Sequence, residues 1–468
     1  MSYEHFLSTK LATAVPTGLT SIPPIHPSLF RFQRDLVTWA LKRGRAAIFC
    51  DTGLGKTRQQ LEWAKHVTAY TGKPTLILAP LAVGAQTCAE ALSIDVACKQ
   101  AKFQGDVTDV GLYVTNYDRL HQFEPSTFGA VVLDESSIIK NHDSKTLDRL
   151  MTAFRDTPFR LCATATPSPN DYTELGTHAE FLGVCSREEM LAEYFTHDGG
   201  DTSKWRLKGH ARGRFWRWVS TWAALLRSPA DLGYDASMYE LPPLTVERHT
   251  VPADQAATLA QGLLFAEPAH GLMDRRRARR DSLSKRAELC AAKINAVDGS
   301  WIVWCELNDE ADALRHSIAG SVEIRGNDET MVKDARLGDF AAGRTRVLIT
   351  KPKIAGFGLN WQHCHHVAFV GVSDSYEATY QAIRRCWRFG QKSPVDVHFF
   401  ASELEGDVVA NYERKQREAI AMAEELSLET RDAVRAEVFG LVRDTNAYQH
   451  EPTLMPAWLT ARAPEAEP

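Results

Sequence analysis

Two sets of short apolar runs, separated by stretches with helical spacing, restrict this chain to an α/β fold. The first set lies between residues 46 and 166, and the second lies between residues 301 and 400. Buried parallel strands read as near-continuous apolar runs, and strands that alternate with helices form βαβ units. We therefore predict two α/β units, each a mostly parallel sheet flanked by helices, with a helical, aromatic-rich stretch at 185–300 between them.

Composition and periodicity divide the 468 residues into five ranges. We expect a lead-in over 1–27, a first α/β domain over 28–245, a helical linker over 246–295, a second α/β domain over 296–440 and a disordered tail over 441–468. The second domain is expected to end in a long helical stretch that begins near residue 401. Each domain is long enough to bury a hydrophobic core of its own.

The overall charge excludes a uniformly basic chain that coats nucleic acid. Lys and Arg number 54 against 59 Asp and Glu, which gives a net charge of −5, although a local basic stripe would still suffice for nucleic-acid binding. The nine cysteines form no CxxC pair, which excludes a zinc ribbon and favours reduced thiols in the cytoplasm. No run of about 18 apolar residues occurs, so we expect no membrane span.

The segment AAIFCDTGLGKTRQQLEWA at 46–64 has the pattern of a phosphate-binding loop. An apolar run leads into a turn with Gly53 and Gly55, and a helical stretch begins at Lys56 and Thr57. Glycines let backbone N–H groups surround phosphate oxygens, and a helix N-terminus adds partial positive charge. Lys56 is then expected to reach the β- and γ-phosphates, and Thr57 to hold Mg²⁺. The strict pattern has one more glycine, which this loop lacks.

Two carboxylates, Asp134 and Glu135, follow the apolar run at 130–133. The carboxyl end of a parallel strand is where such sheets bind ligands. We expect Asp134 to orient Mg²⁺ through water and Glu135 to polarise the water that attacks the γ-phosphate. Two acids at a strand end can also be solvated surface groups, but the phosphate loop upstream favours the catalytic interpretation.

The segment YQAIRRCWRFGQK at 380–392 places Arg385 and Arg388 three residues apart on an expected helix, so that they share a face. Such a face can present guanidinium groups to a γ-phosphate across a cleft, as arginine fingers do. The alternative is a helix face whose arginines pair with local acids or solvent.

Taken together, these segments resemble the core of the superfamily 2 helicases and, within it, the SWI/SNF-type DNA translocases. The Arg-x-x-Arg-x-Gly-Gln ending of the last motif favours the SWI/SNF type. The resemblance extends over roughly 28–400, with the motifs in family order: FRFQRDLVTWAL (30–41), DTGLGKTRQ (51–59), LILAPLAV (76–83), VTNYDRL (114–120), LDESSIIKN (133–141), ATATPSPNDYTELG (163–176), IAGFGLNWQ (354–362) and QAIRRCWRFGQ (381–391).

The resemblance implies two tandem RecA-like domains, with a helical insertion or linker between them, that close on ATP and Mg²⁺ at their interface. The implied catalytic residues are Lys56, Glu135, Arg385 and Arg388. The implied nucleotide-binding residues are Gln33, which would read adenine, together with Thr52, Gly53, Leu54, Gly55, Lys56, Thr57, Asp134 and Gly358, of which Thr57 and Asp134 would hold Mg²⁺.

The family usually tracks duplex DNA by its phosphates and does not part the strands. The resemblance thus implies a translocase on double-stranded DNA, in a compact form like that of bacterial or phage proteins, working in the cytoplasm of a bacterium or phage-infected host, with a recruiting protein as a further possible partner. The alternatives are a strand-separating helicase in replication, recombination or repair, and a nucleotide-switched module that holds DNA or protein. The implied nucleic-acid contacts are Thr115, Asn116, Thr164, Lys353 and Asn360.

Two departures from the family pattern concern how the nucleotide site is linked to the rest of the core. Ser136 and Ser137 follow the acidic pair, where the family often has a histidine that contacts the motif at 163–176. That link must therefore be made by another residue. Lys353 stands where the family usually has an arginine.

Three further segments admit a functional and a structural interpretation. The stretch 204–227 interleaves aromatic and basic residues, which suits stacking on nucleic-acid bases, but Phe215, Trp218 and Trp222 have core-packing spacing. The arginine run at 274–286 is expected to be a solvated face that could contact DNA. The four consecutive residues 363–366 (HCHH) point alternately to opposite faces of a strand, so we expect no metal site there.

Overall fold

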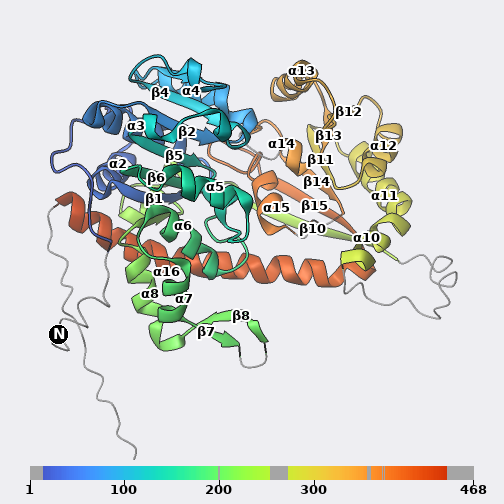
Figure 1. The fold of residues 1–468 in the computed structure, drawn as a ribbon. Coiled ribbons are helices and arrows are strands. Elements are labelled where there is room, and N and C mark those ends of the chain that lie inside the picture. The colour runs from blue at the N-terminus through green and yellow to red at the C-terminus, as the bar shows by residue number, and fades with distance from the viewer. Residues whose placement is uncertain are drawn as a thin grey trace, which may run out of the picture.

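The computed structural model describes residues 14–198, 201–252, 272–355, 360–371, 373 and 375–439. Two parallel sheets, each covered by helices, form two lobes, and the C-terminal helix runs along both of them (Figure 1). The prediction of two α/β units is therefore confirmed. Across the described ranges, no helix has both the length and the apolar character needed to cross a bilayer.

Seven parallel strands form the sheet of the first lobe, in the spatial order β3-β4-β2-β5-β6-β1-β9. Because β1, β5 and β6 are parallel neighbours, the loops that follow them emerge at one edge of the sheet. The strands are β1 (Arg45–Cys50), β2 (Thr75–Ala79), β3 (Cys98–Gln100), β4 (Leu112–Asn116), β5 (Ala130–Asp134), β6 (Phe159–Thr164) and β9 (Ala223–Leu226), and the helices are α2 (Arg31–Arg43), α3 (Lys56–Thr71), α4 (Gly84–Leu92), α5 (Lys145–Phe154), α6 (Leu175–Leu182), α7 (Arg187–Tyr194) and α8 (Arg212–Val219).

Successive residues of β1 point to opposite faces of this sheet, so each face builds its own core. Ile48 packs in the same cluster as Trp39 and Trp63. Phe49 packs on the other face, with Trp222. A two-stranded antiparallel hairpin, β7 (Phe195–Asp198) and β8 (Asp201–Leu207), projects from this second side (Figure 1).

Six parallel strands form the sheet of the second lobe, in the order β10-β15-β14-β11-β13-β12. Trp304 of β11 packs on one face and Trp301 on the other. The strands are β10 (Leu244–Val251), β11 (Trp301–Cys305), β12 (Val322–Glu323), β13 (Val347–Thr350), β14 (His366–Val370) and β15 (Val395–Ser402), and the helices are α10 (Leu272–Asp281), α11 (Leu283–Ala296), α12 (Asn308–Ser317), α13 (Thr330–Ala341), α14 (Pro352–Ala355) and α15 (Tyr376–Ile383).

The last helix, α16 (Gly406–Phe439), has 34 residues and follows the second lobe in the chain, yet most of its contacts are with the first lobe. Met422 and Leu426 join one core cluster of the first lobe, and Val434 joins the other. Glu437 forms an ion pair of 2.7 Å with Arg43 at the end of α2. The predicted second domain, 296–440, thus ends in a helix that closes the core of the first.

The predicted linker, 246–295, needs a correction at its start. Residues 246–251 belong to β10, which pairs in parallel with β15 and forms one edge of the second sheet. Only the last residue of this strand is buried, so its sequence lacks the apolar run by which the other strands were predicted. Residues 253–271 of the linker, the tail over 441–468 and residues 1–13 of the lead-in lie outside the described residues.

The aromatic residues of 204–227 pack in the core, as their spacing predicts. Phe215, Trp216, Trp218 and Trp222 are all buried in one cluster of the first lobe. The arginines between them, Arg212, Arg214 and Arg217, are exposed. Stacking of these tryptophans and Phe215 on nucleic-acid bases is therefore excluded, because no base could reach their rings.

The arginine run at 274–286 is not simply a solvated face, contrary to expectation. Arg279 donates to Glu405 Oε1 at 2.7 Å and is buried. Arg286 is fully buried, and its Nη1 lies 2.8 Å from Glu310 Oε1 without a well-aligned N–H···O angle, so charge rather than a hydrogen bond joins these two atoms. A run of charged residues predicts a solvated surface, because a buried arginine needs a partner that only the fold can supply.

Replacing Glu310 with glutamine is expected to lower the free energy of unfolding by about 1–3 kcal/mol, because the buried Arg286 guanidinium would lose its charged partner. Urea denaturation followed by circular dichroism measures this loss. The matched control is Glu288→Gln, at an exposed position of α11. Equal stability of the two variants would contradict the assignment of a stabilising buried pair.

Candidate nucleotide site between the lobes

The phosphate loop between β1 and α3 has the backbone geometry that its glycines predict. Gly53 has φ +95° and Gly55 has φ +75°, in the left-handed region that favours glycine. A Cβ on Gly55 would lie 2.4 Å from Gln33 Nε2, and a Cβ on Gly53 would lie 2.8 Å from Phe389 Cβ. Any other residue at these two positions would therefore be both strained and crowded.

Gln33 holds this loop from α2. Its Nε2 donates to Leu54 O at 2.9 Å, and its Oε1 accepts from Phe30 N at 2.9 Å. The side chain is buried. Gln33 thus lies at the loop, where the resemblance places it, and its contact with adenine stays a prediction.

Lys56 and Thr57 open α3 directly after the loop. Lys56 Nζ donates to Cys50 O at 2.8 Å, so the ammonium folds back over the loop. Thr57 is half-buried. The Lys56 ammonium, the Thr57 hydroxyl and the backbone of the loop therefore lie close together, as a phosphate-binding site requires.

The acidic pair lies at the end of β5, beside the phosphate loop. Asp134 Oδ1 accepts from Gln60 Nε2 of α3 at 2.7 Å. Burial raises the pKa of both Asp134 and Glu135, while the charge of Lys56 lowers both. Glu135 also has φ +52°, an unusual backbone conformation for a residue other than glycine, of the kind that is often found at functional sites.

The link that the missing histidine would provide is made by other residues. Thr164 Oγ1, at the end of β6, donates to Glu135 Oε2 at 3.2 Å and accepts from Thr166 N at 3.1 Å. Ser136 Oγ lies 3.1 Å from His178 Nε2 of α6, and both residues are fully buried. Burial lowers the pKa of His178 to about 4, so this histidine is neutral at pH 7.

A second link reaches from the acidic loop to the other lobe. Glu377 of α15 forms an ion pair with Lys140 and accepts a hydrogen bond from Thr166 Oγ1 at 3.2 Å. One carboxylate of the second lobe therefore contacts residues from both the 133–141 and the 163–176 motifs.

A third link joins the phosphate loop itself to the second lobe. Arg384 Nη2 lies 2.6 Å from Asp51 Oδ2 and donates to Thr52 O at 3.0 Å. Tyr380 OH donates to Asp51 as well. Asp51, Tyr380 and Glu377 were not predicted as site residues, because no local pattern in the sequence pairs these particular side chains, which are more than 200 positions apart.

The two predicted arginine fingers follow the end of α15 at Ile383 instead of sharing a helix face as predicted, and the charges of different acids act on them. Arg385 is buried, donates to Gln381 Oε1 at 2.7 Å and is influenced by the charge of Glu135. Arg388 is influenced instead by Glu90 of α4. Burial lowers the pKa of each arginine to about 10, so both stay charged at pH 7. In this arrangement Arg385, rather than Arg388, is the arginine associated with Glu135.

The predicted nucleic-acid contacts are distributed unevenly. Lys353 and Asn360 are exposed, and Asn116 Oδ1 accepts from Arg119 N at 3.0 Å. Thr115 is buried at the end of β4. Thr164 is fully buried and its hydroxyl donates a hydrogen bond to Glu135, so its position does not support direct contact with nucleic acid. Gly358 lies outside the described residues.

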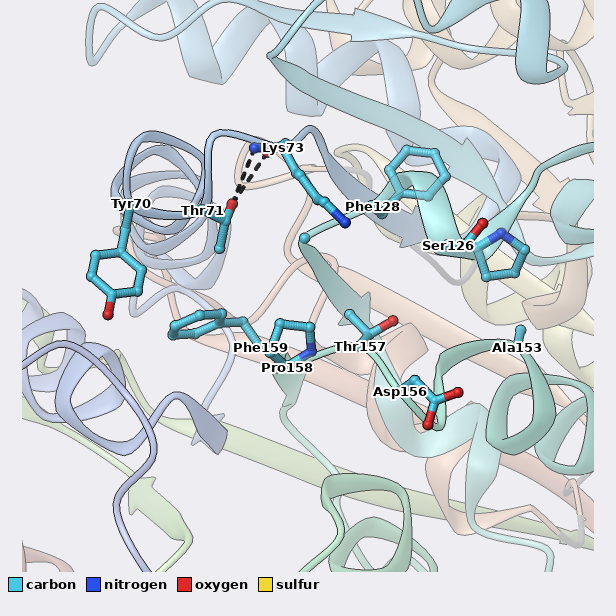
Figure 2. A pocket seen from close by; sticks show the side chains of 12 residues that line it. Tyr70, Thr71, Lys73, Ser126, Phe128, Ala153, Asp156, Thr157, Pro158 and Phe159 are labelled. Atoms are coloured by element: carbon cyan, nitrogen blue, oxygen red, sulfur yellow. Dashed lines mark hydrogen bonds between the residues drawn. The ribbon is translucent and has the colours of Figure 1, made fainter.

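A surface pocket lies at the opposite edge of the first sheet, where β2, β5 and β6 begin (Figure 2). Tyr70, Lys73 and Phe159 are among the residues that line it. It contains no predicted site residue. The residues that are predicted to bind the nucleotide therefore gather at the carboxyl edge of the sheet and not at this pocket.

Two protein-family models match the chain. Residues 32–197 match the model of the SNF2-related domain, and residues 284–390 match that of the helicase conserved C-terminal domain. No curated protein matches the chain in sequence. A solved structure similar to the chain is the Sulfolobus solfataricus SWI2/SNF2 ATPase core in complex with dsDNA, at 15% identity and TM-score 0.41, covering 90% of this chain and 98% of that chain.

Proposed function

The chain belongs to the SWI/SNF-type helicases of superfamily 2, and on this premise we propose that it hydrolyses Mg·ATP between its lobes and thereby translocates along duplex DNA. The family makes it an ATP-dependent DNA motor. Our proposal adds that the motor moves along double-stranded DNA and that particular residues bind ATP, activate water and stabilise the transition state.

One observation carries the proposal: hydrogen bonds join Glu135 of the first lobe through Thr164 and Thr166 to Glu377 of the second lobe. Arg385 of the second lobe lies on the same side of the interface, where its charge lowers the pKa of Glu135. A carboxylate that orients water and an arginine that stabilises transition-state charge are the two protein groups that phosphoryl transfer to water most needs. Since each lobe supplies one of them, hydrolysis depends on how the lobes approach each other.

The donor set beside the phosphate loop fits Mg²⁺. Thr57 offers a hydroxyl oxygen and Asp134 a carboxylate oxygen, and both are hard ligands of the kind this ion prefers. When bound, the ion would neutralise charge on the β- and γ-phosphate oxygens. Gln60 holds the Asp134 carboxylate in place by a hydrogen bond of 2.7 Å.

The interlobe contacts suggest how the state of the nucleotide reaches the DNA. A change at Glu135 is transmitted through Thr164 to Thr166, and Thr166 contacts Glu377 of the other lobe. Lys353 and Asn360 of that lobe are exposed and available for phosphates. Closing and reopening of the lobes would then move these contacts along the backbone.

The proposal is tested by the steady-state ATPase rate without nucleic acid and with blunt duplex DNA, single-stranded DNA or RNA, at low and moderate salt. We expect the duplex to stimulate most, and the stimulation to fade with salt because phosphate contacts release counterions. Stimulation by single strands alone would favour the strand-separating helicase. Turnover that no nucleic acid changes would contradict the proposal and favour the switch.

Translocation is separated from DNA-stimulated hydrolysis by a triplex-displacement assay. A motor that tracks intact duplex removes a third strand from the duplex, whereas a forked duplex without a third strand reports strand separation. We expect ATP-dependent removal of the third strand and an intact duplex. Retention of the third strand despite normal DNA-stimulated hydrolysis would contradict the translocation step alone.

A further inference from the structure

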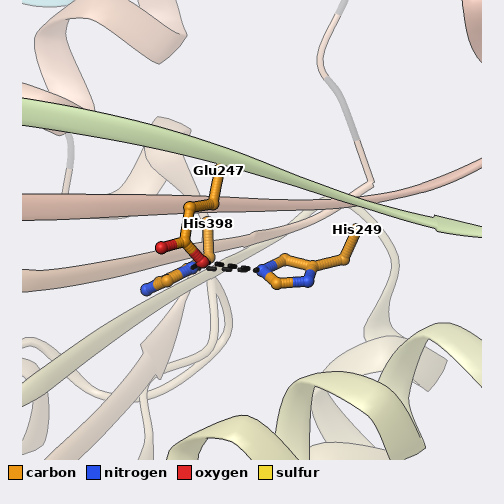
Figure 3. A group of neighbouring side chains, drawn as sticks. All are labelled: Glu247, His249 and His398. Carbon is orange, nitrogen blue, oxygen red and sulfur yellow. Dashed lines mark hydrogen bonds and ion pairs between the residues drawn. The ribbon is translucent and has the colours of Figure 1, made fainter.

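Three side chains with metal-binding atoms converge on one face of the second sheet, and none of them belongs to the nucleotide site (Figure 3). Glu247 and His249 lie two residues apart on β10, so their side chains share a face. His398 lies on the neighbouring strand β15, in register with Glu247. The parallel pairing of these two strands therefore brings the three together.

The distances between the three ligand atoms match those around a tetrahedral metal ion. His249 Nε2 lies 3.1 Å from His398 Nδ1, His398 Nδ1 lies 3.2 Å from Glu247 Oε2, and His249 Nε2 lies 3.6 Å from the same oxygen. Donor atoms about 2.0–2.1 Å from a tetrahedral Zn²⁺ are about 3.3–3.4 Å apart. The triangle thus has the size that a single ion would impose.

Hydrogen bonds alone satisfy this triangle poorly. Each neutral imidazole nitrogen presents either a proton or a lone pair. If both nitrogens carry protons, two N–H groups face each other across 3.1 Å, and Glu247 Oε2, at 3.2 and 3.6 Å, accepts a well-aligned hydrogen bond from neither of them. If only one carries a proton, a lone pair is left facing another lone pair along one side. A cation at the centre would satisfy all three atoms at once.

We propose that Glu247, His249 and His398 bind one divalent late first-row metal ion, Zn²⁺ foremost, through one atom each, with water in the fourth position. Two imidazoles and a carboxylate are a donor set that suits this class of ion. Neighbouring aromatic rings orient both histidines: His249 stacks on Phe400 with ring centroids 4.6 Å apart, and His398 packs against Trp301.

One nearby group opposes the ion. Lys293 Nζ of α11 lies 3.5 Å from Glu247 Oε2 and neutralises part of the same charge. Its side chain is partly exposed, so the ammonium can move into solvent when the ion enters. Removing this lysine charge should therefore strengthen metal binding, which a site held together only by hydrogen bonds does not predict.

A metal ion at this site would cross-link strands β10 and β15. β10 is the edge strand of its sheet, and only its last residue is buried. An ion bound to residues of both strands would hold the edge strand β10 against β15. Because the ion binds only when both strands are in register, it stabilises the folded second lobe.

The test is a titration of the chelator-treated full chain with ZnCl₂ against a fluorescent zinc indicator, without nucleotide or Mg²⁺. We expect one ion per chain, at least about tenfold weaker binding in Glu247→Gln and His249→Ala as expected for a lost ligand, and tighter binding in Lys293→Met. His316→Ala is the matched control, since His316 is exposed on α12 and makes a hydrogen bond to Asp312 O within the same helix. Glu247 is exposed, so its variant leaves the core intact.

Two further readouts separate this site from adventitious binding to cysteines. Co²⁺ bound by nitrogen and oxygen ligands should give visible absorption without the intense thiolate bands. Zn²⁺ should raise the melting temperature of the unmodified chain but not that of Glu247→Gln. Absence of zinc binding, or binding that is equal in Glu247→Gln, His249→Ala and the control, would overturn the proposal.

Discussion

Glu135→Gln is expected to reduce the rate of ATP hydrolysis at least about 100-fold while ATP binding is retained. The glutamine keeps the size of the side chain and can still accept from Thr164, which donates to Glu135 Oε2 at 3.2 Å. It cannot take a proton from water. Because the phosphate loop and Lys56 are unchanged, the nucleotide should bind as before.

The measurement compares steady-state hydrolysis with the affinity for a fluorescent ATP analogue, in the presence of duplex DNA. Glu124→Gln is the matched control, because Glu124 is an exposed acid of the same lobe away from the site. Near-normal hydrolysis by Glu135→Gln would show that another group activates the water. Loss of nucleotide binding would show instead that the carboxylate supports the loop.

Lys56→Ala is expected to abolish turnover and to weaken ATP binding. The lysine is the only charged side chain in the segment 52–57, and its ammonium lies over the loop, where it donates to Cys50 O at 2.8 Å. Without it the γ-phosphate loses a point charge that both binds it and stabilises the transition state.

This prediction is checked by the same two assays, with Lys65→Ala as control. Lys65 lies on α3 as well, but its partner is Glu62, 3.6 Å away within the helix. If both variants melt at the same temperature as the unchanged protein, unfolding is excluded as the cause of lost turnover. Measurable DNA-stimulated turnover in Lys56→Ala would contradict the assignment of this loop as the phosphate site.

Elements with a strong local signal could be predicted from the sequence. β1, β5 and β6 are mostly apolar and fully or almost fully buried, and the glycines of the phosphate loop have the positive φ that the pattern requires. β9 was missed because its four apolar residues follow a helix and resemble its continuation. β10 was missed because seven of its eight residues are not buried.

The resemblance predicted which segments meet at the interface, but the individual side-chain contacts between them could not be predicted. Thr164 belongs to a motif that the resemblance associates with nucleic acid, yet the fold turns its hydroxyl toward Glu135. His178 fills the role expected of a residue next to Glu135, but it comes from α6. Such pairings depend on tertiary packing, which leaves no periodicity or spacing in the sequence.

The C-terminal helix changes its partner lobe within a single turn. Tyr412 packs against Phe399 and Tyr376 of the second lobe, and Glu413 pairs with Arg248. Only two residues later, Lys415 donates to Asn170 Oδ1 of the first lobe at 2.8 Å. From there to its end, α16 remains on the first lobe.

A continuous α-helix resists bending, because each turn is held by its own backbone hydrogen bonds. α16 is therefore a rigid element that is anchored along the first lobe, and its contacts change from the second lobe to the first at residues 412–415. We therefore expect the second lobe to rotate about residues 412–415 when the two lobes separate, and not to slide along the first lobe. A substitution that kinks the helix at residues 412–415 is expected to permit other relative movements of the lobes without changing any residue that is predicted to bind ATP.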